Sequence, residues 1–312
     1  MIRAPVILLQ VTIWLATAAH CVAQLRGGES GAAGSLHSAS FQSIALAGEL
    51  RHLVYLPNGY ASSGAGRFTA VYLLHGRGGS MEAWRQIHTE LDRMIAAGKI
   101  PPIIAIMPDA PSIQRAGYYV DSQFADGARV ETAFTQELIA HVDASYRTQA
   151  HRRGRIVAGY SMGGYGALRF GLVHPELFGA AIVLSPAVYV PLPPRASSAR
   201  EFGAFGRGSV RFDEAIYREK NYPAVLPAFE VARLPLAMFI AVGDQEQALP
   251  NPAEASHDLD YEAHTLYNRV RRVPGITARL RVLDGGHGWE VWRPALTEGL
   301  VFAFAQLGAA RD

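Results

Sequence analysis

The chain has 312 residues and a globular composition, with 49% hydrophobic and 18% charged residues. A formal net charge of +2, without a long run of Lys or Arg, excludes the usual electrostatic signature of a nucleic-acid-binding protein. The sequence contains neither a His-Glu-x-x-His motif nor a phosphate-binding glycine loop, so we expect no metal and no organic cofactor.

The first 23 residues have the pattern of a secretory signal peptide. Arg3 supplies a positive charge, residues 6–16 form a short apolar core, and small residues lead up to Ala23. Cleavage after Ala23 would remove Cys21, the only cysteine, so the mature chain would form no disulfide. The core is too short for a permanent membrane span. We therefore expect a secreted or periplasmic protein with a flexible, Gly- and Ser-rich lead-in over residues 24–45.

Strand-like and helix-like segments alternate through the rest of the chain. Continuous apolar runs indicate strands covered on both faces, and apolar residues three and four positions apart indicate helices. This alternation predicts an α/β fold with a mostly parallel central sheet and helices on both faces, in a single domain over residues 46–312. The expected order is strand 50–56, strand 68–74, helix 81–97, strand 103–109, helix 130–146, strand 155–158, helix 164–174, strand 180–184, a proline-rich cap-like insertion with short helices at 188–235, strand 236–242, helix 261–273, strand 278–283 and helix 294–307.

The run Gly-Tyr-Ser-Met-Gly occupies residues 159–163, between an expected strand and an expected helix. Ser161 on so sharp a turn needs a glycine two residues away on either side, because a Cβ there would clash with the neighbouring strand and helix. The turn also places the hydroxyl at a helix N-terminus, whose dipole favours developing negative charge. The motif predicts that Ser161 is the nucleophile of an α/β-hydrolase.

A serine hydroxyl needs a base to remove its proton, and in this fold the order along the chain is serine, acid, histidine. Of the 11 histidines, three follow the expected strand 236–242, namely His257, His264 and His287. His287 comes directly after the strand 278–283, and the glycines beside it allow an irregular loop that brings the imidazole toward Ser161. We therefore predict that His287 is the base.

Two acidic residues follow the strand 236–242 in the run Gly-Asp-Gln-Glu. Hydrolases of this fold commonly place the acid three residues after that glycine, which favours Glu246 as the residue that orients His287. Asp244 is the main alternative, because it could orient the histidine or cap the end of the strand. Three further candidates lie later in the same connection: Glu254, Asp258 and Asp260.

The oxyanion hole of this fold uses two backbone N–H groups. One is that of Met162, the residue after the nucleophile. The other comes from the loop after the strand 68–74, where the run His-Gly-Arg-Gly-Gly makes Arg77 the best candidate. His75 precedes the nucleophile and lies at a strand end, so we expect it to shape this loop instead of acting as a base.

Several motifs occur together between residues 50 and 307: Tyr-Leu-Leu-His-Gly at 72–76, Tyr-Tyr-Val-Asp-Ser at 118–122, Glu-Leu-Ile at 137–139, Gly-Tyr-Ser-Met-Gly-Gly-Tyr-Gly-Ala-Leu at 159–168, His-Pro-Glu-Leu-Phe at 174–178 and Gly-Gly-His-Gly-Trp at 285–289. In this combination the chain resembles an esterase family of α/β-hydrolases. That family includes esterase D-like enzymes, feruloyl and acetyl-xylan esterases, enterobactin esterase-like proteins and bacterial mycolyltransferases. The resemblance implies Ser161 as nucleophile, His287 as base and Glu246 as acid, although the family more often has aspartate at the acid position.

The resemblance also concerns residues around the site. It implies that Tyr118, Tyr119 and Asp121 lie near the mouth of the site as pocket or structural residues. Trp289 and Trp292 either line the site or pack the last helix against the core.

These features predict a serine carboxylesterase that hydrolyses a small-molecule or glycan-linked ester through an acyl-enzyme. Two alternatives remain open. The first is an acyltransferase that passes the acyl group to a sugar or lipid alcohol, and the second is a hydrolase-fold binding protein without activity. We expect no nucleic-acid partner and no stable membrane insertion after signal cleavage.

Overall fold

The computed structural model describes residues 33–110, 117–247 and 252–309, all within one compact unit, Ala32–Asp312. The predicted signal peptide, residues 1–23, lies outside the described residues, as does the beginning of the predicted lead-in. Among the helices in the described ranges, none combines the length and the apolar character needed to span a bilayer.

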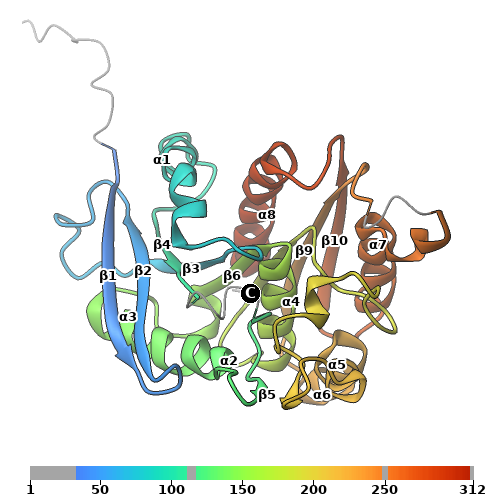
Figure 1. Ribbon diagram of the computed structural model, residues 1–312. Helices are drawn as coiled ribbons and strands as arrows, with labels where there is room; N and C mark the ends of the chain where they lie inside the picture. Colours follow the sequence, from blue (N-terminus) through green and yellow to red (C-terminus); the bar gives the residue numbers. More distant parts are fainter. Residues whose placement is uncertain (1–32, 111–116, 248–251, 310–312) are drawn as a thin grey trace, which may run out of the picture. The chain divides into compact units, whose positions relative to one another are not determined.

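An eight-stranded sheet forms the centre of the fold (Figure 1). Six neighbouring strands of this sheet run parallel, and the two remaining strands, at one edge, make antiparallel pairs. The prediction of a mostly parallel sheet is therefore confirmed. In spatial order the strands are β1 (Ser35–Ser43), β2 (Gly48–Leu56), β4 (Ile103–Pro108), β3 (Thr69–Leu74), β6 (Arg155–Tyr160), β7 (Ala180–Leu184), β9 (Leu236–Gly243) and β10 (Ile276–Leu283).

The first strand corrects the expectation of a flexible lead-in over residues 24–45. Residues 35–43 form β1, which pairs with β2 along its whole length, from Ser35 opposite Leu56 to Ser43 opposite Gly48. The strand was not expected because most β1 side chains are exposed and small or polar. Only Leu36 and Phe41 pack against the core, on opposite faces, so the strand is held mainly by its backbone pairing with β2. The turn after it is fixed by Glu137, whose carboxylate accepts hydrogen bonds from Ser43 Oγ at 2.5 Å and from the Ala45 N–H at 3.0 Å.

Helices cover both faces of the sheet, as predicted. One face packs against η1 (Met81–Ile87), α1 (His88–Ala96) and α8 (Trp289–Ala309), and the buried apolar residues there form one cluster. The other face packs against a second cluster that is formed with α2 (Val130–Thr132), η3 (Ala133–Leu138), α3 (Ile139–Ser145), α4 (Met162–Val173) and α7 (Leu259–Val270).

Two predicted helices differ in detail from the structure. The segment 81–97 begins as the 3-10 helix η1 before it continues as α1, and the segment 130–146 contains the π-helical turn η3 between α2 and α3. The last helix begins at Trp289 and includes Pro294, which the sequence had suggested as its start.

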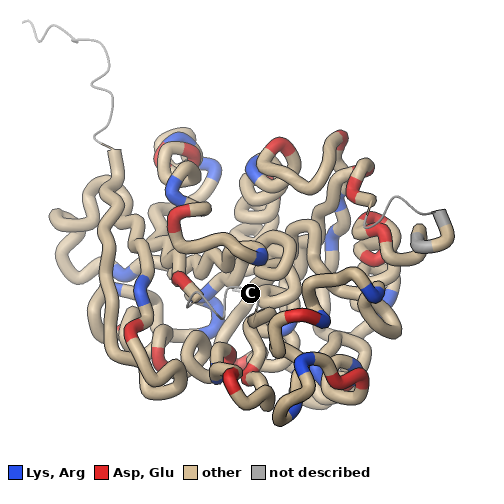
Figure 2. The backbone as a smooth tube through the Cα atoms, viewed as in Figure 1, with Lys and Arg blue, Asp and Glu red and all other residues tan. Residues whose placement is uncertain are grey.

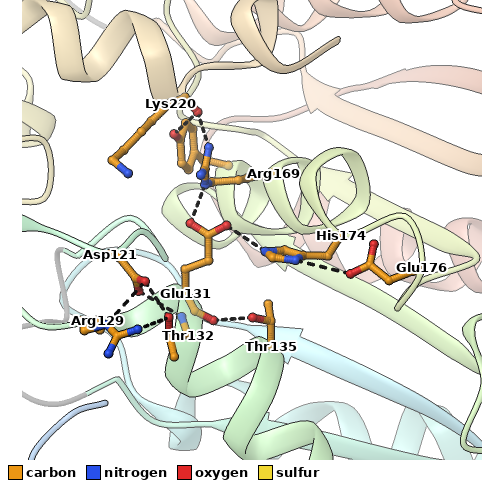
Figure 3. A network of polar contacts seen from close by, with 10 residues as sticks. Asp121, Arg129, Glu131, Thr132, Thr135, Arg169, His174, Glu176 and Lys220 are labelled. Atoms are coloured by element: carbon orange, nitrogen blue, oxygen red, sulfur yellow. Dashed lines mark hydrogen bonds and ion pairs between the residues drawn. The ribbon is translucent and has the colours of Figure 1, made fainter. Parts of the chain in front are cut away.

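The predicted insertion at residues 188–235 contains η5 (Ser198–Arg200), β8 (Arg207–Gly208), α5 (Glu214–Lys220) and α6 (Tyr222–Ala232). β8 pairs with β5 (Gln123–Phe124) in a small two-stranded sheet. The end of α5 is tied to α4, because the Lys220 carbonyl accepts hydrogen bonds from Arg169 Nη1 at 2.7 Å and from the Tyr165 hydroxyl at 2.8 Å (Figure 3). This segment is thus anchored to the helix that follows Ser161.

A buried polar network supports that anchor (Figure 3). Glu131 accepts hydrogen bonds from Arg169 Nε at 2.9 Å and from His174 Nε2 at 2.8 Å. These bonds join α2 to α4 at Arg169 and to His174, the residue that follows α4. Burial opposes ionisation of Glu131, but the His174 hydrogen bond and the Arg169 charge together hold the pKa of Glu131 below its ordinary value. Elsewhere, Lys and Arg are interspersed with Asp and Glu along the visible chain (Figure 2).

Candidate active site

Ser161 lies at the tight turn between β6 and α4, in a backbone conformation with φ 57° and ψ −120°. This conformation is strained for a residue with a side chain, and such strain is concentrated at functional sites. A Cβ on Gly159 would lie 2.2 Å from the Gly163 carbonyl oxygen, and a Cβ on Gly163 would lie 2.2 Å from the Leu74 carbonyl oxygen. The two flanking glycines are therefore required by close backbone approach, as the motif predicted.

The carboxyl ends of parallel strands meet at one edge of the sheet, which is where ligands bind in open α/β folds. β6, β7, β9 and β10 are successive neighbours, so the loops that follow them converge at this edge. The Ser161 N–H donates to the Leu184 carbonyl at 2.9 Å, and the Ser161 carbonyl accepts from the Ala187 N–H at 3.1 Å. The turn that carries Ser161 is thereby fixed to the loop after β7.

His287 and Glu246 form a direct hydrogen bond, with 2.7 Å between His287 Nδ1 and Glu246 Oε2. A carboxylate can only accept, so Nδ1 carries a proton, and in the neutral imidazole the lone pair is therefore on Nε2. The Glu246 side chain is 0% exposed, whereas 38% of the His287 side chain is exposed. The pair therefore has a buried anionic end and an accessible imidazole, which is the arrangement that a general base requires.

Asp244 has a different partner. Its side chain is exposed, and its Oδ1 accepts the Gly285 N–H at 3.0 Å, which fixes the loop before His287. Of the two acidic residues after β9, the structure brings Glu246 to the imidazole and uses Asp244 to cap the loop. The other candidates lie further along the connection: Glu254 falls in η6 (Pro252–His257), Asp258 is the N-cap residue of α7, and Asp260 lies in the first turn of α7.

The second oxygen of Glu246 is also fully engaged. Glu246 Oε1 accepts the Gly243 N–H at 2.7 Å and the Ser185 hydroxyl at 2.5 Å. Ser185 Oγ in turn accepts the indole N–H of Trp292 at 2.9 Å. Sequence reasoning missed Ser185, although its position directly after the buried strand β7, at the edge that carries Ser161, was an available signal.

Aromatic rings surround the imidazole. The rings of His287 and Trp292 are perpendicular with centroids 5.0 Å apart, and Trp292 stacks on Tyr160 at 4.2 Å. Tyr160 is the residue before Ser161, so this stack connects the imidazole to the nucleophile turn. Trp84 and Trp289 complete the cluster. Trp292 is buried, so of the two roles expected for it, the structure is consistent with packing.

The loop after β3 lies against Ser161. A Cβ on Gly76 would lie 2.6 Å from Tyr160 Cε2 and 3.3 Å from the Ser161 Cβ, so a side chain at this position would clash with the Tyr160 ring. Arg77 follows Gly76 in this loop, and Met162 is the first residue of α4. The two residues predicted to supply oxyanion N–H groups thus belong to the loop after β3 and to the helix after Ser161. Their role in binding an oxyanion stays a prediction.

His75 shapes this loop. Its Nδ1 donates to the Gly76 carbonyl at 2.8 Å, and its Nε2 accepts the Ala110 N–H at 3.2 Å. The Tyr119 hydroxyl donates to the His75 carbonyl at 2.9 Å. Both ring nitrogens of this buried histidine are engaged in holding backbone, as expected for a structural residue.

The Tyr-Tyr-Val-Asp-Ser segment also contributes structure. Tyr118 and Tyr119 are buried and have positive φ angles of 49° and 54°. Asp121 accepts hydrogen bonds from the N–H of Thr132 at 2.9 Å and from its hydroxyl at 2.6 Å, so it stabilises α2 (Figure 3). Of the two roles expected for Asp121, the geometry favours the structural one. Within the described ranges, no group of three His, Cys, Asp or Glu residues is arranged to hold a metal ion.

Comparisons with known proteins identify the family of the chain. The profile of the family described as "Putative esterase" matches residues 43–303. The chain is 36% identical over 143 residues to an esterase of Mycobacterium tuberculosis, which covers 45% of this chain and 30% of the relative. It is 32% identical over 151 residues to an endo-1,4-beta-xylanase/feruloyl esterase of Xylanibacter ruminicola, which covers 44% of this chain and 20% of the relative. The matches thus span less than a third of these relatives.

Solved structures with the same fold cover nearly the whole chain. A ferulic acid esterase superposes with a TM-score of 0.69 at 24% identity, over 87% of this chain and 98% of the other. An S-formylglutathione hydrolase from Agrobacterium tumefaciens superposes with a TM-score of 0.64 at 21% identity, over 89% and 96%. At these identities the likeness shows the fold. From the profile match and this fold, the chain belongs to the esterase family of α/β-hydrolases.

Proposed function

We propose that this protein is a serine carboxylesterase in which Ser161 is the nucleophile, His287 the base and Glu246 the acid. The observation that carries the proposal is the 2.7 Å bond between His287 and a fully buried Glu246, at the sheet edge that also holds the strained Ser161 turn. Membership of the esterase family supports an ester as the substrate.

The first half of the reaction follows from these positions. His287 Nε2 takes the Ser161 hydroxyl proton while Oγ attacks the ester carbonyl carbon, and Glu246 stabilises the imidazolium that forms. The N–H groups of Met162 and Arg77 donate to the oxyanion of the tetrahedral intermediate. The intermediate collapses when the bond to the alcohol oxygen breaks and His287 gives its proton to that oxygen.

The second half reverses these roles. Water enters as the alcohol leaves. His287 removes a proton from this water while the water oxygen attacks the acyl-enzyme carbonyl. The second intermediate releases Ser161, which regains its proton, and the free carboxylic acid leaves. No cofactor enters the sequence of steps.

For the substrate, we propose a small-molecule or glycan-linked carboxylic ester that the protein meets outside the cytoplasm, after cleavage of residues 1–23. A feruloyl esterase is among both the sequence relatives and the structures of the same fold, which makes hydroxycinnamoyl esters the first class to test. The panel should also contain short p-nitrophenyl esters, acetylated sugars and siderophore esters.

The test compares the wild-type protein with Ser161→Ala and with Ser62→Ala, an exposed serine remote from the site. We expect Ser161→Ala to lower kcat by roughly 10⁴- to 10⁶-fold on a short p-nitrophenyl ester, and Ser62→Ala to leave it unchanged. Activity of Ser161→Ala within tenfold of the wild type would refute the proposal. Product analysis with an added alcohol acceptor distinguishes the acyltransferase alternative, since a hydrolase releases free acid even when acceptor is plentiful.

A further inference from the structure

A chain of three buried side chains ends on the carboxylate that holds His287. It runs from Trp292 on α8 to Ser185 after β7 and then to Glu246 after β9, and these residues are 7%, 0% and 3% exposed. Of the three, Glu246 is the residue that bonds to His287, at 2.7 Å. We call this the Trp292–Ser185–Glu246 chain.

The direction of the hydrogen bonds in this chain is determined by chemistry. An indole N–H can only donate, so Ser185 Oγ must accept from Trp292. The Ser185 hydroxyl proton is then free for one partner, and the carboxylate oxygen Glu246 Oε1 lies 2.5 Å away. A bond of this length to an ionised acceptor belongs to the strong, charge-assisted class. Trp292 therefore aligns the Ser185 hydroxyl toward Glu246.

A glutamate needs such alignment more than an aspartate would, because its side chain has one more rotatable bond. Three hydrogen bonds restrict that freedom: Oε1 accepts from Gly243 and Ser185, and Oε2 bonds to His287. Ser185 is itself held firmly, since its N–H donates to the Ala241 carbonyl at 2.7 Å and its φ angle is 41°. The position of Oε1 is thus fixed from outside the triad.

We propose that Ser185 and Trp292 are positioning residues that hold the Glu246 carboxylate in the rotamer from which Oε2 reaches His287 Nδ1. The inference rests on the proposed esterase function for its kinetic consequence, but its geometric consequence is independent of any substrate. Loss of the Ser185 hydroxyl leaves Oε1 with one partner and the buried Trp292 N–H without its acceptor. The carboxylate then rotates, and the imidazole loses its fixed orientation.

The kinetic test uses Ser185→Ala with Ser43→Ala as its matched control. Ser43 is also buried and also donates to a glutamate carboxylate at 2.5 Å, but its partner is Glu137 beside the β1–β2 turn. Each variant therefore loses one serine–carboxylate hydrogen bond. We expect Ser185→Ala to lower kcat about 10- to 100-fold with KM within about twofold, and Ser43→Ala to keep kcat unchanged at a similar loss of Tm.

A second variant covers the case in which Ser185→Ala does not fold. Trp292→Phe keeps an aromatic ring against Tyr160 and His287 but removes the indole donor. We expect it to lower kcat about 3- to 10-fold, and the double variant Ser185→Ala/Trp292→Phe to be no slower than Ser185→Ala alone, because both act through one chain. If the fold-losses in kcat of the two single variants multiplied in the double variant, the result would contradict this coupling.

A spectroscopic readout separates this proposal from the proposed function. The His287 Nδ1 proton, assigned by its disappearance in His287→Gln, should give a downfield NMR resonance that is protected from exchange by its bond to Glu246. In Ser185→Ala this resonance should move upfield and broaden, and in Ser43→Ala it should not change. An unchanged resonance together with kcat equal to that of Ser43→Ala would overturn the positioning role. A wild-type protein inactive on every ester, with a resonance that still responds to Ser185→Ala, would instead refute the proposed function alone.

Discussion

Glu262 on α7 is predicted to make the stability of this protein fall as pH rises. Its side chain is 1% exposed, and its Oε1 accepts the Val190 N–H at 2.9 Å. Burial raises the pKa of Glu262 from 4.5 to about 8, against the opposing effects of the Val190 hydrogen bond and the Arg269 charge. The folded protein therefore holds a proton on Glu262 that the unfolded chain releases.

The direction and size of the effect follow from linkage. Between pH 4.5 and about 8 the folded state binds more protons at Glu262 than the unfolded state, so the free energy of unfolding decreases as pH rises. Each tenfold change in proton affinity is worth about 1.36 kcal/mol, so the full effect amounts to about 5 kcal/mol. It is absent below pH 4.5 and complete above pH 8.

Glu262→Gln removes this contribution. The amide keeps a carbonyl oxygen for the Val190 N–H and cannot ionise, so the variant differs from the wild type in the titration of Glu262 and of His257, whose Nδ1 lies 3.8 Å from Glu262 Oε1. We expect its stability relative to the wild type to increase by several kcal/mol between pH 5 and pH 9, measured by urea denaturation at a series of pH values. Asp260→Asn, on the same helix, serves as the control. A stability difference for Glu262→Gln that stays constant across this range would refute the reasoning.

Three further predictions concern the site and its supports. Glu246→Gln should lower kcat about 10³- to 10⁴-fold because the amide cannot stabilise the imidazolium, whereas Asp244→Asn should keep kcat within about tenfold of the wild type. If steady-state kinetics showed the larger loss of kcat in Asp244→Asn, Glu246 would not be the acid. Gly163→Ala should lose more than about 3 kcal/mol in urea unfolding, since its Cβ would meet the Leu74 carbonyl at 2.2 Å, and wild-type stability would contradict the close approach. Glu131→Gln should destabilise the protein at pH 7, and the loss should disappear as pH falls below the depressed pKa of Glu131; a loss that persists in acid would count against the ionised network.

Much of the fold was predictable because its signals are local. A buried parallel strand such as β4 or β9 needs a continuous apolar run, and the Ser161 turn needs glycines at fixed positions. β1 was not predictable in this way. Its two large apolar residues, Leu36 and Phe41, pack against opposite faces and do not form the alternating pattern of a strand with one buried face. The rest of the strand is held by backbone pairing with β2, which leaves no pattern in the sequence.

The candidate site was also predictable from the sequence only in part. His287 and Glu246 could be proposed because each follows a recognisable strand, and the structure brings the two together. Ser185 was indicated only by its position directly after β7, and Glu262 could not be proposed at all, because the roles of both depend on partners distant in sequence. Ser185 is significant only once Trp292 and Glu246 lie beside it, and Glu262 occupies an ordinary position in a helical pattern until the loop at Val190 covers it.

The activation of Ser161 by His287 is tested most directly by covalent labelling. The wild-type protein, Ser161→Ala and His287→Ala are treated with a fluorophosphonate, and the modified peptide is identified by mass spectrometry while the rate of labelling is followed. We predict rapid, stoichiometric labelling at Ser161 in the wild type, none in Ser161→Ala, and a rate at least about 100-fold lower in His287→Ala. Labelling at another residue, or an equal rate in His287→Ala, would contradict the assignment of nucleophile and base.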